Sequence, residues 1–312
     1  MTEKTQPNGV LLVNKPKGMT SHDVVAFLRR KLQMTEVGHA GTLDPMAEGL
    51  LVCLLGDTTK LSDFLLNENK AYLAKVRFGI RTDTMDLEGE VLENREVHVD
   101  GVQLKMAVTA LQGDFQWPVP IFSAVKKDGK KLYEHARANE AVELPVRMMS
   151  FPKAEIKAQS STEVDVEIAC SKGSFIRTWA SQLGEKLGVP SVLAGLTRTK
   201  SEPYHLDRSL TLGEIESLDT AKIMAHQAYI PFDQCLPGLK GLSVRGKDLK
   251  LVMNGQVPHD IERRLVPDQR ARNATGGSEF LRILDGETGQ LRALLQLAAL
   301  EPVKIRRVFK RP

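Results

Sequence analysis

The stretch Gly38-His-Ala-Gly-Thr-Leu-Asp-Pro-Met-Ala-Glu-Gly-Leu-Leu-Val52 changes from turn-forming residues to apolar ones within a few positions. Pro45 disfavours the helical backbone region for Asp44, and the glycines permit sharp turns. This pattern predicts a stiff loop over residues 38–45 that holds the Asp44 carboxylate at its end. The apolar run Leu50–Leu55, bounded by glycines, predicts a fully buried strand directly after the loop.

Helical and strand patterns are mixed around this loop without a regular repeat. Apolar residues at helical spacing predict an amphipathic helix over residues 22–33, and alternation predicts a strand over residues 71–78 with Tyr72 on its apolar face. Further patterns predict helices over 59–66, 102–111 and 130–138, a strand over 164–170, and a helix that Ser174 caps. The mixture predicts an α+β fold with a mixed, largely antiparallel sheet.

The length of the chain and its composition predict two domains. A chain of 312 residues is long enough for about two domains of ordinary size. A change of composition near residues 231–241 places the boundary between a first domain, 1–235, and a second, 236–312. Short apolar segments in the second domain predict a small β-rich module, with an insertion near residues 257–278.

Nucleotide-binding, zinc-protease and serine-hydrolase functions are disfavoured by what the sequence lacks. There is no Walker A segment, no dinucleotide-binding glycine motif, no HExxH and no Gly-x-Ser-x-Gly elbow. The three cysteines, Cys53, Cys170 and Cys235, are too far apart in the chain for a zinc pattern and predict buried or incidental thiols. The polar N-terminus lacks a secretory core and no apolar run approaches the roughly 20 residues that span a bilayer. We therefore expect a cytoplasmic protein without a membrane partner.

Charge is concentrated at the C-terminal end. The net charge is +4, but residues 241–312 carry 14 basic and 8 acidic side chains, and five basic residues lie within residues 301–311. Such a tail binds a polyanion by releasing counterions, or it is simply a solvated end. The charge pattern alone leaves both interpretations open.

Two residues outside the apolar pattern are candidates for chemistry. Asp44 in its rigid loop can act as a catalytic carboxylate, but an aspartate also closes ordinary turns. Arg177 lies in the first turn of its predicted helix, where the helix dipole disfavours a cation, so we expect an acidic partner elsewhere in the fold. The pattern alone does not decide between these readings for Asp44.

The loop around Asp44 resembles the catalytic motif of the TruB family of tRNA pseudouridine synthases. Supporting segments follow in the order of that family and together cover residues 9–205. They are Asn14–Val25, Lys70–Tyr72, Arg81–Asp86, Phe122–Lys126, Tyr133–Arg137 and Cys170–Arg177. The chain departs from the family at Trp117 and Val119, where Gln and Pro are usual, and at Phe175, where Tyr is frequent.

The resemblance implies a pseudouridine-synthase catalytic domain followed by a small PUA-like β-barrel that binds RNA. It implies isomerisation of uridine-55 in the TΨC loop of tRNA by base flipping, without cofactor or metal. It also implies that the protein is a monomer with no obligatory protein partner. The tRNA would be bound at its TΨC stem-loop and at its acceptor end. The chain would also be able to assist tRNA folding.

Matched position by position, the resemblance assigns roles to six residues. Asp44 falls on the catalytic aspartate and Arg177 on the arginine that pairs with it, where a guanidinium can hold a carboxylate through two hydrogen bonds. The substrate-contacting positions are His39, Tyr72, Phe175 and Leu196. An ionised aspartate could attack C1′ or C6, or take the C2′ proton, and the residues do not choose among these routes. Tyr72 could stack on the flipped base and relay a proton, or be an ordinary core tyrosine.

Two other functions stay open at this point. The same surface would serve a non-catalytic protein that binds or folds RNA, although intact Asp44, Tyr72 and Arg177 favour an enzyme. A pseudouridine synthase that acts on ribosomal RNA is a further alternative, against which the loop over residues 38–45 argues.

Overall fold

A computed structural model describes residues 6–66, 69–265, 278–298 and 301–309. Within these residues, ten strands form one sheet in which neighbours run antiparallel except β13 with β3 and β1 with β15. The main path is β11 (Lys153–Gln159), β12 (Glu163–Cys170), β4 (Lys70–Phe78), β13 (Ser191–Ser201), β3 (Glu48–Leu55), β1 (Gly9–Lys15) and β15 (Leu210–Thr211). Beside this path, β2 (Val37–Ala40) pairs with β3, β14 (Tyr204–His205) with β13, and β16 (Tyr229–Pro231) with β1. The predicted α+β class with a largely antiparallel sheet is confirmed.

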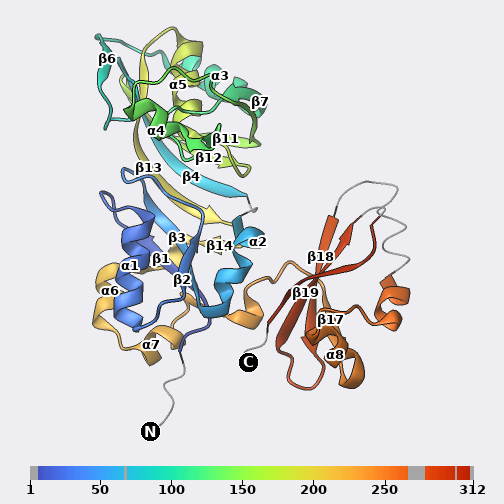
Figure 1. Cartoon of the computed structure of the whole chain (residues 1–312). Coiled ribbons are helices and arrows are strands. Elements are labelled where there is room, and N and C mark those ends of the chain that lie inside the picture. Colours follow the sequence, from blue (N-terminus) through green and yellow to red (C-terminus); the bar gives the residue numbers. More distant parts are fainter. Residues whose placement is uncertain (1–5, 67–68, 266–277, 299–300, 310–312) are drawn as a thin grey trace.

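The sheet joins two bodies through β13. This strand pairs with β4 over most of its length and with β3 at Thr197 and Arg198. Figure 1 shows β4 and β13 running from an upper body to a lower one. The upper body carries α3 (Gly101–Ala110), α5 (Ile176–Leu187) and β7 (Gly113–Pro118), with which β10 (Val146–Phe151) pairs. The lower body carries α1 (Ser21–Leu32), α6 (Leu212–Ser217) and α7 (Thr220–Ala225).

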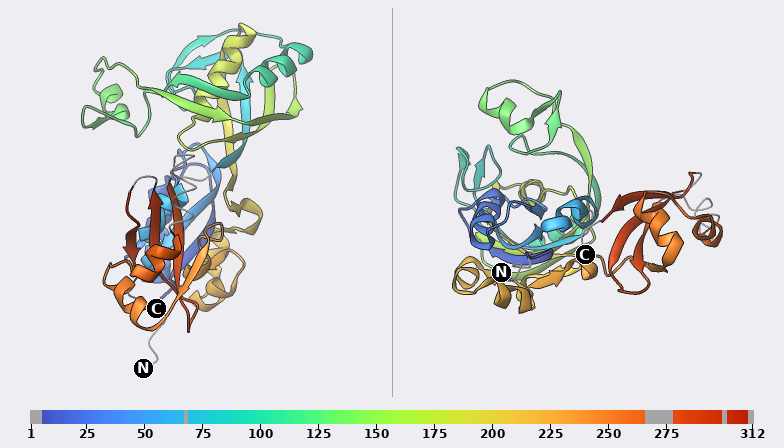
Figure 2. Two further views of the ribbon diagram at one scale, coloured as in Figure 1. Left: turned by 90° about the vertical axis from the view of Figure 1, so that its right-hand side faces the viewer. Right: turned by 60° about the horizontal axis from the view of Figure 1, so that its bottom comes forward.

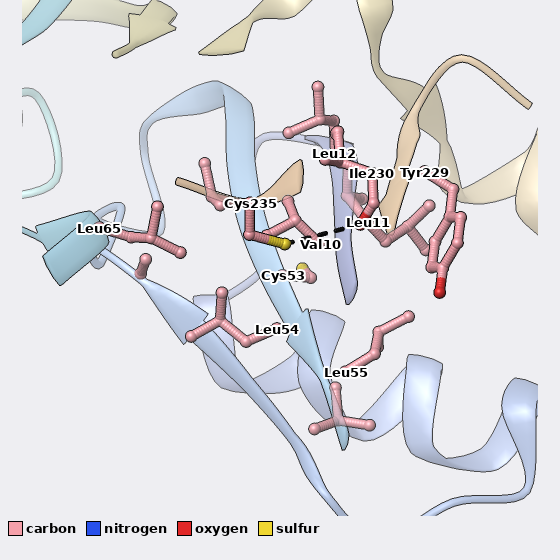
Figure 3. Packing of buried hydrophobic residues seen from close by; sticks show 14 of the residues in the cluster. Val10, Leu11, Leu12, Cys53, Leu54, Leu55, Leu65, Tyr229, Ile230 and Cys235 are labelled. Carbon is pink, nitrogen blue, oxygen red and sulfur yellow. Dashed lines mark hydrogen bonds between the residues drawn. The ribbon is translucent and has the colours of Figure 1, made fainter. Parts of the chain in front are cut away.

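Each body has its own apolar core. In the lower one, Leu11, Leu54 and the thiol of Cys53 are fully or almost fully buried between the sheet and the surrounding helices (Figure 3). Burial raises the pKa of the Cys53 thiol above its usual range, so this thiol stays protonated and unreactive. Cys170 and Cys235 are also buried and free, which confirms the prediction for the cysteines.

Trp179 of α5 lies at the centre of the upper core. It is fully buried, and its indole N–H donates to the Leu111 carbonyl at 3.2 Å, at the end of α3. This hydrogen bond ties the two helices together while the ring fills the space between them and the sheet. Because α5 also carries Arg177, the packing of Trp179 sets the position of that arginine.

Between β7 and β10, residues 119–145 leave the upper body as an arm that projects away from it (Figure 2). The arm contains the hairpin of β8 (Lys126–Lys127) and β9 (Lys130–Lys131), followed by α4 (Leu132–Arg137). A second small hairpin joins β5 (Ile80–Thr82) and β6 (Val91–Asn94). Its connection, residues 83–90, holds Asp86 near α5.

After the 3₁₀ helix η3 (Phe232–Gln234), the chain forms a separate four-stranded sheet within the described residues. Its order is β17 (Gly241–Val244), β18 (Ser278–Asp285), β19 (Leu291–Ala298) and β20 (Lys304–Val308), with α8 (Gly246–Met253) between the first two strands. The predicted β-rich module is confirmed. Of the expected insertion at residues 257–278, residues 259–265 are helical and residues 266–277 lie outside the described part.

Aromatic contacts attach this second sheet to the lower body. The rings of Phe232 and Phe309 meet edge to face with centroids 4.9 Å apart, and those of Phe64 and Phe280 do so at 4.8 Å. Phe64 belongs to the short helix α2 (Ser62–Leu66). No helix in the described ranges is long and apolar enough to cross a membrane.

Two local predictions were wrong. Residues 38–40 are not loop but part of β2, because their backbone groups pair with β3. Phe175, not Ser174, is the residue that precedes α5, and no side chain caps this helix. The predicted helix over residues 59–66 is present, its first part as the 3₁₀ helix η1 (Gly56–Leu61) and its second part as α2.

Trp179→Ala should lower the free energy of unfolding by about 3–5 kcal/mol, because it leaves a cavity and frees the Leu111 carbonyl. Urea unfolding followed by circular dichroism measures this change. Val102→Ala on the exposed face of α3, where the side chain is 69% exposed, is the control and should cost about 0.5 kcal/mol or less. Equal effects of the two substitutions would contradict the role given to Trp179.

Candidate active site

The Asp44 loop is fastened to the N-terminal part of α1. The Ser21 hydroxyl accepts a hydrogen bond from the Leu43 N–H at 2.9 Å and lies 3.2 Å from the Leu43 carbonyl, to which it donates. On the other side of Asp44, the Gly18 N–H donates to the Pro45 carbonyl at 2.8 Å. The loop is therefore held by hydrogen bonds on both sides of the aspartate.

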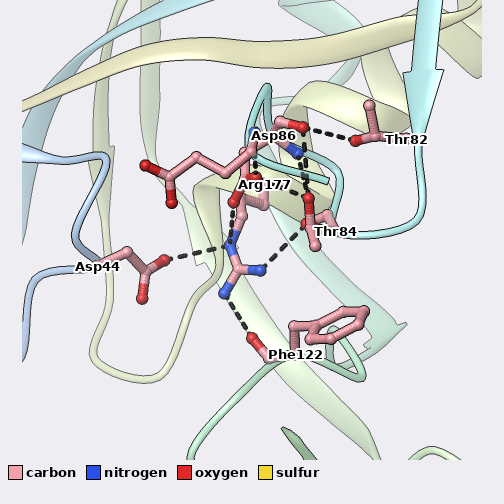
Figure 4. Close-up of polar contacts among 7 residues, drawn as sticks. Asp44, Thr82, Thr84, Asp86, Phe122 and Arg177 are labelled. Carbon is pink, nitrogen blue, oxygen red and sulfur yellow. Dashed lines mark hydrogen bonds and ion pairs between the residues drawn. The ribbon is translucent and has the colours of Figure 1, made fainter. Parts of the chain in front are cut away.

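Asp44 forms an ion pair with Arg177 (Figure 4). The Arg177 Nε lies 3.2 Å from Asp44 Oδ2. The other two guanidinium nitrogens donate to the carbonyls of Thr84, at 3.1 Å, and Phe122, at 2.8 Å. Asp44 is thus an acidic partner of Arg177, as predicted. The arginine contacts this carboxylate through Nε alone, and not through the two hydrogen bonds that were expected.

The two partners differ in exposure. The side chain of Arg177 is 7% exposed, whereas that of Asp44 is 44% exposed. The guanidinium is therefore a fixed part of the interior, and the carboxylate stands at the edge of the solvent. A carboxylate in this position is held in one place and still open to a substrate.

Asp86 is a second carboxylate at this arginine, and the sequence pattern did not predict a role for it. It is 5% exposed, and its Oδ2 lies 3.9 Å from the Arg177 Nε. Its Oδ1 accepts from the Thr84 hydroxyl at 2.6 Å and from the Glu88 N–H at 3.1 Å. The segment Arg81–Asp86 resembles the corresponding segment of the family, but nothing in the pattern indicates that its last residue reaches α5.

Asp44 and Arg177 line a cavity of about 460 Å³. Three more of the six predicted site residues line it as well: Tyr72, Phe175 and Leu196. They come from β4, from the turn before α5, and from β13. The cavity is thus lined by two aromatic side chains, an aliphatic side chain and an ion pair. Ser123, Lys126 and Arg147, from the arm and its base, complete one edge.

Tyr72 is partly buried in this cavity. Burial raises the pKa of its phenol, although the nearby Arg198 guanidinium acts in the opposite direction. The hydroxyl therefore stays protonated at neutral pH and can donate a hydrogen bond. Tyr72 and Phe175 line the same cavity.

His39 is the sixth predicted residue, and the structure does not place it among the residues that line the cavity. It lies on β2, where its ring meets that of His22 edge to face at 6.5 Å. Its Nδ1 is buried without a hydrogen-bond partner in the described part of the chain. Burial lowers the pKa of His39, and the charges of His22 and Arg198 lower it further, so the neutral ring is favoured.

A larger cavity, of about 610 Å³, lies elsewhere, between α2 and the residues that lead to β17. Phe64, Leu236 and Phe280 give it a mostly apolar wall, and the Lys200–Glu202 ion pair lies at its edge. It brings together no carboxylate and arginine of the kind found at Asp44. Among the described residues, no group of His, Cys, Asp or Glu side chains could hold a metal ion.

The fold is that of the pseudouridine synthases. A chain of the Cbf5-Nop10-Gar1 complex superposes with a TM-score of 0.69 at 20% identity, over 96% of this chain and 84% of that one. A chain of the archaeal box H/ACA sRNP Nop10-Cbf5 complex gives 0.68 at 19% identity, over 99% and 88%. The strand-rich C-terminal region agrees with a PUA-like domain.

Sequence comparison identifies the family within this fold. Residues 29–176 match the model of the TruB family pseudouridylate synthase N-terminal domain. The tRNA pseudouridine synthase B of Bdellovibrio bacteriovorus is 42% identical over 99% of both chains. The protein of the same name from Staphylococcus saprophyticus is 34% identical over 97% of this chain and 99% of its own. The chain belongs to the TruB family of pseudouridylate synthases.

The raised pKa of Tyr72 makes stability depend on pH. The phenol ionises at its ordinary pKa of 10.0 in the unfolded chain and at a higher pH in the folded chain. Its contribution to the free energy of unfolding is therefore complete below pH 10.0, and it is lost as the pH rises through the pKa of the folded state. Urea unfolding of the protein and of Tyr72→Phe, from about pH 8 to about pH 11, should show the smaller decline for Tyr72→Phe. Parallel declines would contradict the assignment.

Proposed function

We propose that this chain isomerises uridine-55 in the TΨC loop of tRNA to pseudouridine, with Asp44 as the catalytic carboxylate. The observation that carries the proposal is the Asp44–Arg177 pair at the mouth of an aromatic-lined cavity. Relatives that match along nearly the whole chain are called tRNA pseudouridine synthase B, which supports tRNA as the substrate. The segment over residues 38–45, which resembles the catalytic motif of the family, supports the TΨC loop as the target.

The reaction needs a carboxylate but no change of oxidation state. The N1–C1′ bond of the uridine breaks, the base turns, and a bond between C5 and C1′ forms. C5 then loses its proton and N1 gains one, so the product is an isomer of the substrate. Asp44 can attack C1′ or C6, or it can remove the C2′ proton. The half-exposed carboxylate beside a buried cation suits each of these roles. In this proposal the chemistry uses neither cofactor nor metal.

Arg177 holds Asp44 in place while the base turns. The permanent charge of its guanidinium favours the ionised carboxylate, and its two bonds to the Thr84 and Phe122 carbonyls prevent it from following the aspartate into solvent. Because Asp44 is 44% exposed, bound RNA would exclude water and strengthen the contact.

The uridine must leave its stack to reach the cavity. Extrusion of a stacked base costs a few kcal/mol, and a stack on an aromatic ring returns about 1–3 kcal/mol. Tyr72 and Phe175 offer such rings, with Leu196 as a third apolar contact. The Tyr72 hydroxyl can also relay the proton that leaves C5. His39, outside the lining residues, is proposed to fill the space that the flipped base leaves.

The remaining contacts would be to the rest of the tRNA. We propose that residues 236–312 form a PUA-like domain that binds near the acceptor end, while residues 1–235 bind the TΨC stem-loop. The enzyme would act in the cytoplasm as a monomer with no obligatory protein partner. It would also assist tRNA folding, since flipping a base and annealing a loop use the same binding surface.

Purified protein should convert one uridine of a TΨC stem-loop RNA, that at position 55, in the presence of excess EDTA. Mapping of pseudouridine by chemical derivatisation and primer extension checks this. A stem-loop with cytidine at position 55, and with its other uridines kept, is the control and should stay unmodified. Conversion of other uridines, or binding without any conversion, would favour the alternative specificity or the non-catalytic function.

Arg306→Gln with Arg307→Gln should weaken binding of full-length tRNA. Both side chains are exposed on β20. Each phosphate contact that is lost should reduce the slope of log affinity against log salt by about 0.9, the value for B-DNA. Affinity for the stem-loop alone, measured over the same salt range, should not change. Equal losses for both RNAs would contradict the proposed contact with the distant part of the tRNA.

A further inference from the structure

Arg198, on β13, is a buried charge that the chemistry above leaves unused. It is 1% exposed, less than Arg177. A buried charge is tolerated only where polar atoms surround it. Here each of the three guanidinium nitrogens donates to a backbone carbonyl. Nε donates to Leu50 at 2.7 Å, Nη2 to Gly41 at 3.1 Å and Nη1 to Thr42 at 3.3 Å.

These carbonyls lie on both sides of Asp44. Gly41 and Thr42 precede the aspartate, and Leu50 follows it in β3. One rigid, planar group therefore binds the chain on both sides of the aspartate. Gly41 permits the approach, because its φ of +97° suits glycine and an added Cβ would lie 3.4 Å from the Arg198 Nη1.

Arg198 also stands between the two bodies of the sheet. Its backbone pairs with Tyr72 of β4 on one side and with Gly49 of β3 on the other. Its side chain lies near the Tyr72 phenol, whose pKa it lowers against the effect of burial. Leu196, which lines the cavity, is two residues earlier on the same strand. One residue thus connects the Asp44 loop, Tyr72 and Leu196.

We infer that Arg198 is a positioning residue, which sets the distance between the Asp44 carboxylate and the base that Tyr72 and Leu196 hold. The inference rests on the proposed function. Lysine in its place keeps the charge, but an ammonium cannot reproduce the planar fork that reaches three carbonyls. A displacement of about 1 Å in a reacting group costs about 10²-fold in rate. Substrate affinity depends on many other contacts and should change little.

The test compares rate with affinity. For Arg198→Lys, the single-turnover rate of pseudouridine formation on a saturating TΨC stem-loop should fall about 100-fold, while the Kd for the same RNA stays within about threefold. Arg29→Lys is the matched control, because the Arg29 guanidinium also donates to a backbone carbonyl, that of Val37 at 2.9 Å, but at the far end of β2 from the Asp44 loop. It should keep the wild-type rate and Kd.

Gly41→Ala is a second variant that keeps every charge. It disturbs the contact between Arg198 and the loop from the other side and should produce the same loss of rate with retained affinity. Wild-type rates in both well-folded variants would overturn the inference, as would parallel losses of rate and affinity or loss of folding in both. A wild-type protein that forms no pseudouridine would instead refute the proposed function.

Discussion

A guanidinium cannot shed its charge, so one that is buried must be surrounded by oxygen atoms, and two such groups organise this site. Arg177 gathers the Asp44 carboxylate and the carbonyls of Thr84 and Phe122. Arg198 gathers three carbonyls from the two ends of the Asp44 loop. The two arginines thereby hold together segments that lie far apart in the sequence. The position of Asp44 is set by these segments more than by contacts of its own side chain.

The sheet explains why these segments meet. β13 lies between β4 and β3 in the sheet and pairs with both at Thr197 and Arg198, and the cavity is lined by residues of β4 and β13 together with the Asp44 loop. The rigid scaffold supplies Tyr72 and Leu196, while loops supply Asp44 and Phe175. The second sheet is attached through aromatic pairs such as Phe232 with Phe309, so its removal would expose part of the lower core. Charge substitutions on its surface therefore test RNA binding more cleanly than truncation does.

Local patterns predicted what local interactions determine. The strands around Leu50–Leu55 and Tyr72, and the helix that carries Arg177, follow from apolar periodicity, and the need for an acid near Arg177 follows from the helix dipole. The strand β2 was missed because only pairing with β3 makes it a strand. Asp86 and Arg198 were missed because their partners are distant, with 148 positions between Arg198 and Leu50. The roles of Tyr72, Phe175 and Leu196 came from family resemblance, since no spacing in the sequence brings them to one cavity.

The central claim is that Asp44 performs chemistry and does not merely close a turn. Asp44→Asn keeps the shape of the side chain and removes its charge and its basicity. With a TΨC stem-loop RNA, the account predicts a Kd within about threefold of the wild type and no detectable pseudouridine in a single turnover. The wild type, assayed beside it, should convert the RNA completely. A variant that retains as much as about a tenth of the wild-type rate would contradict the account.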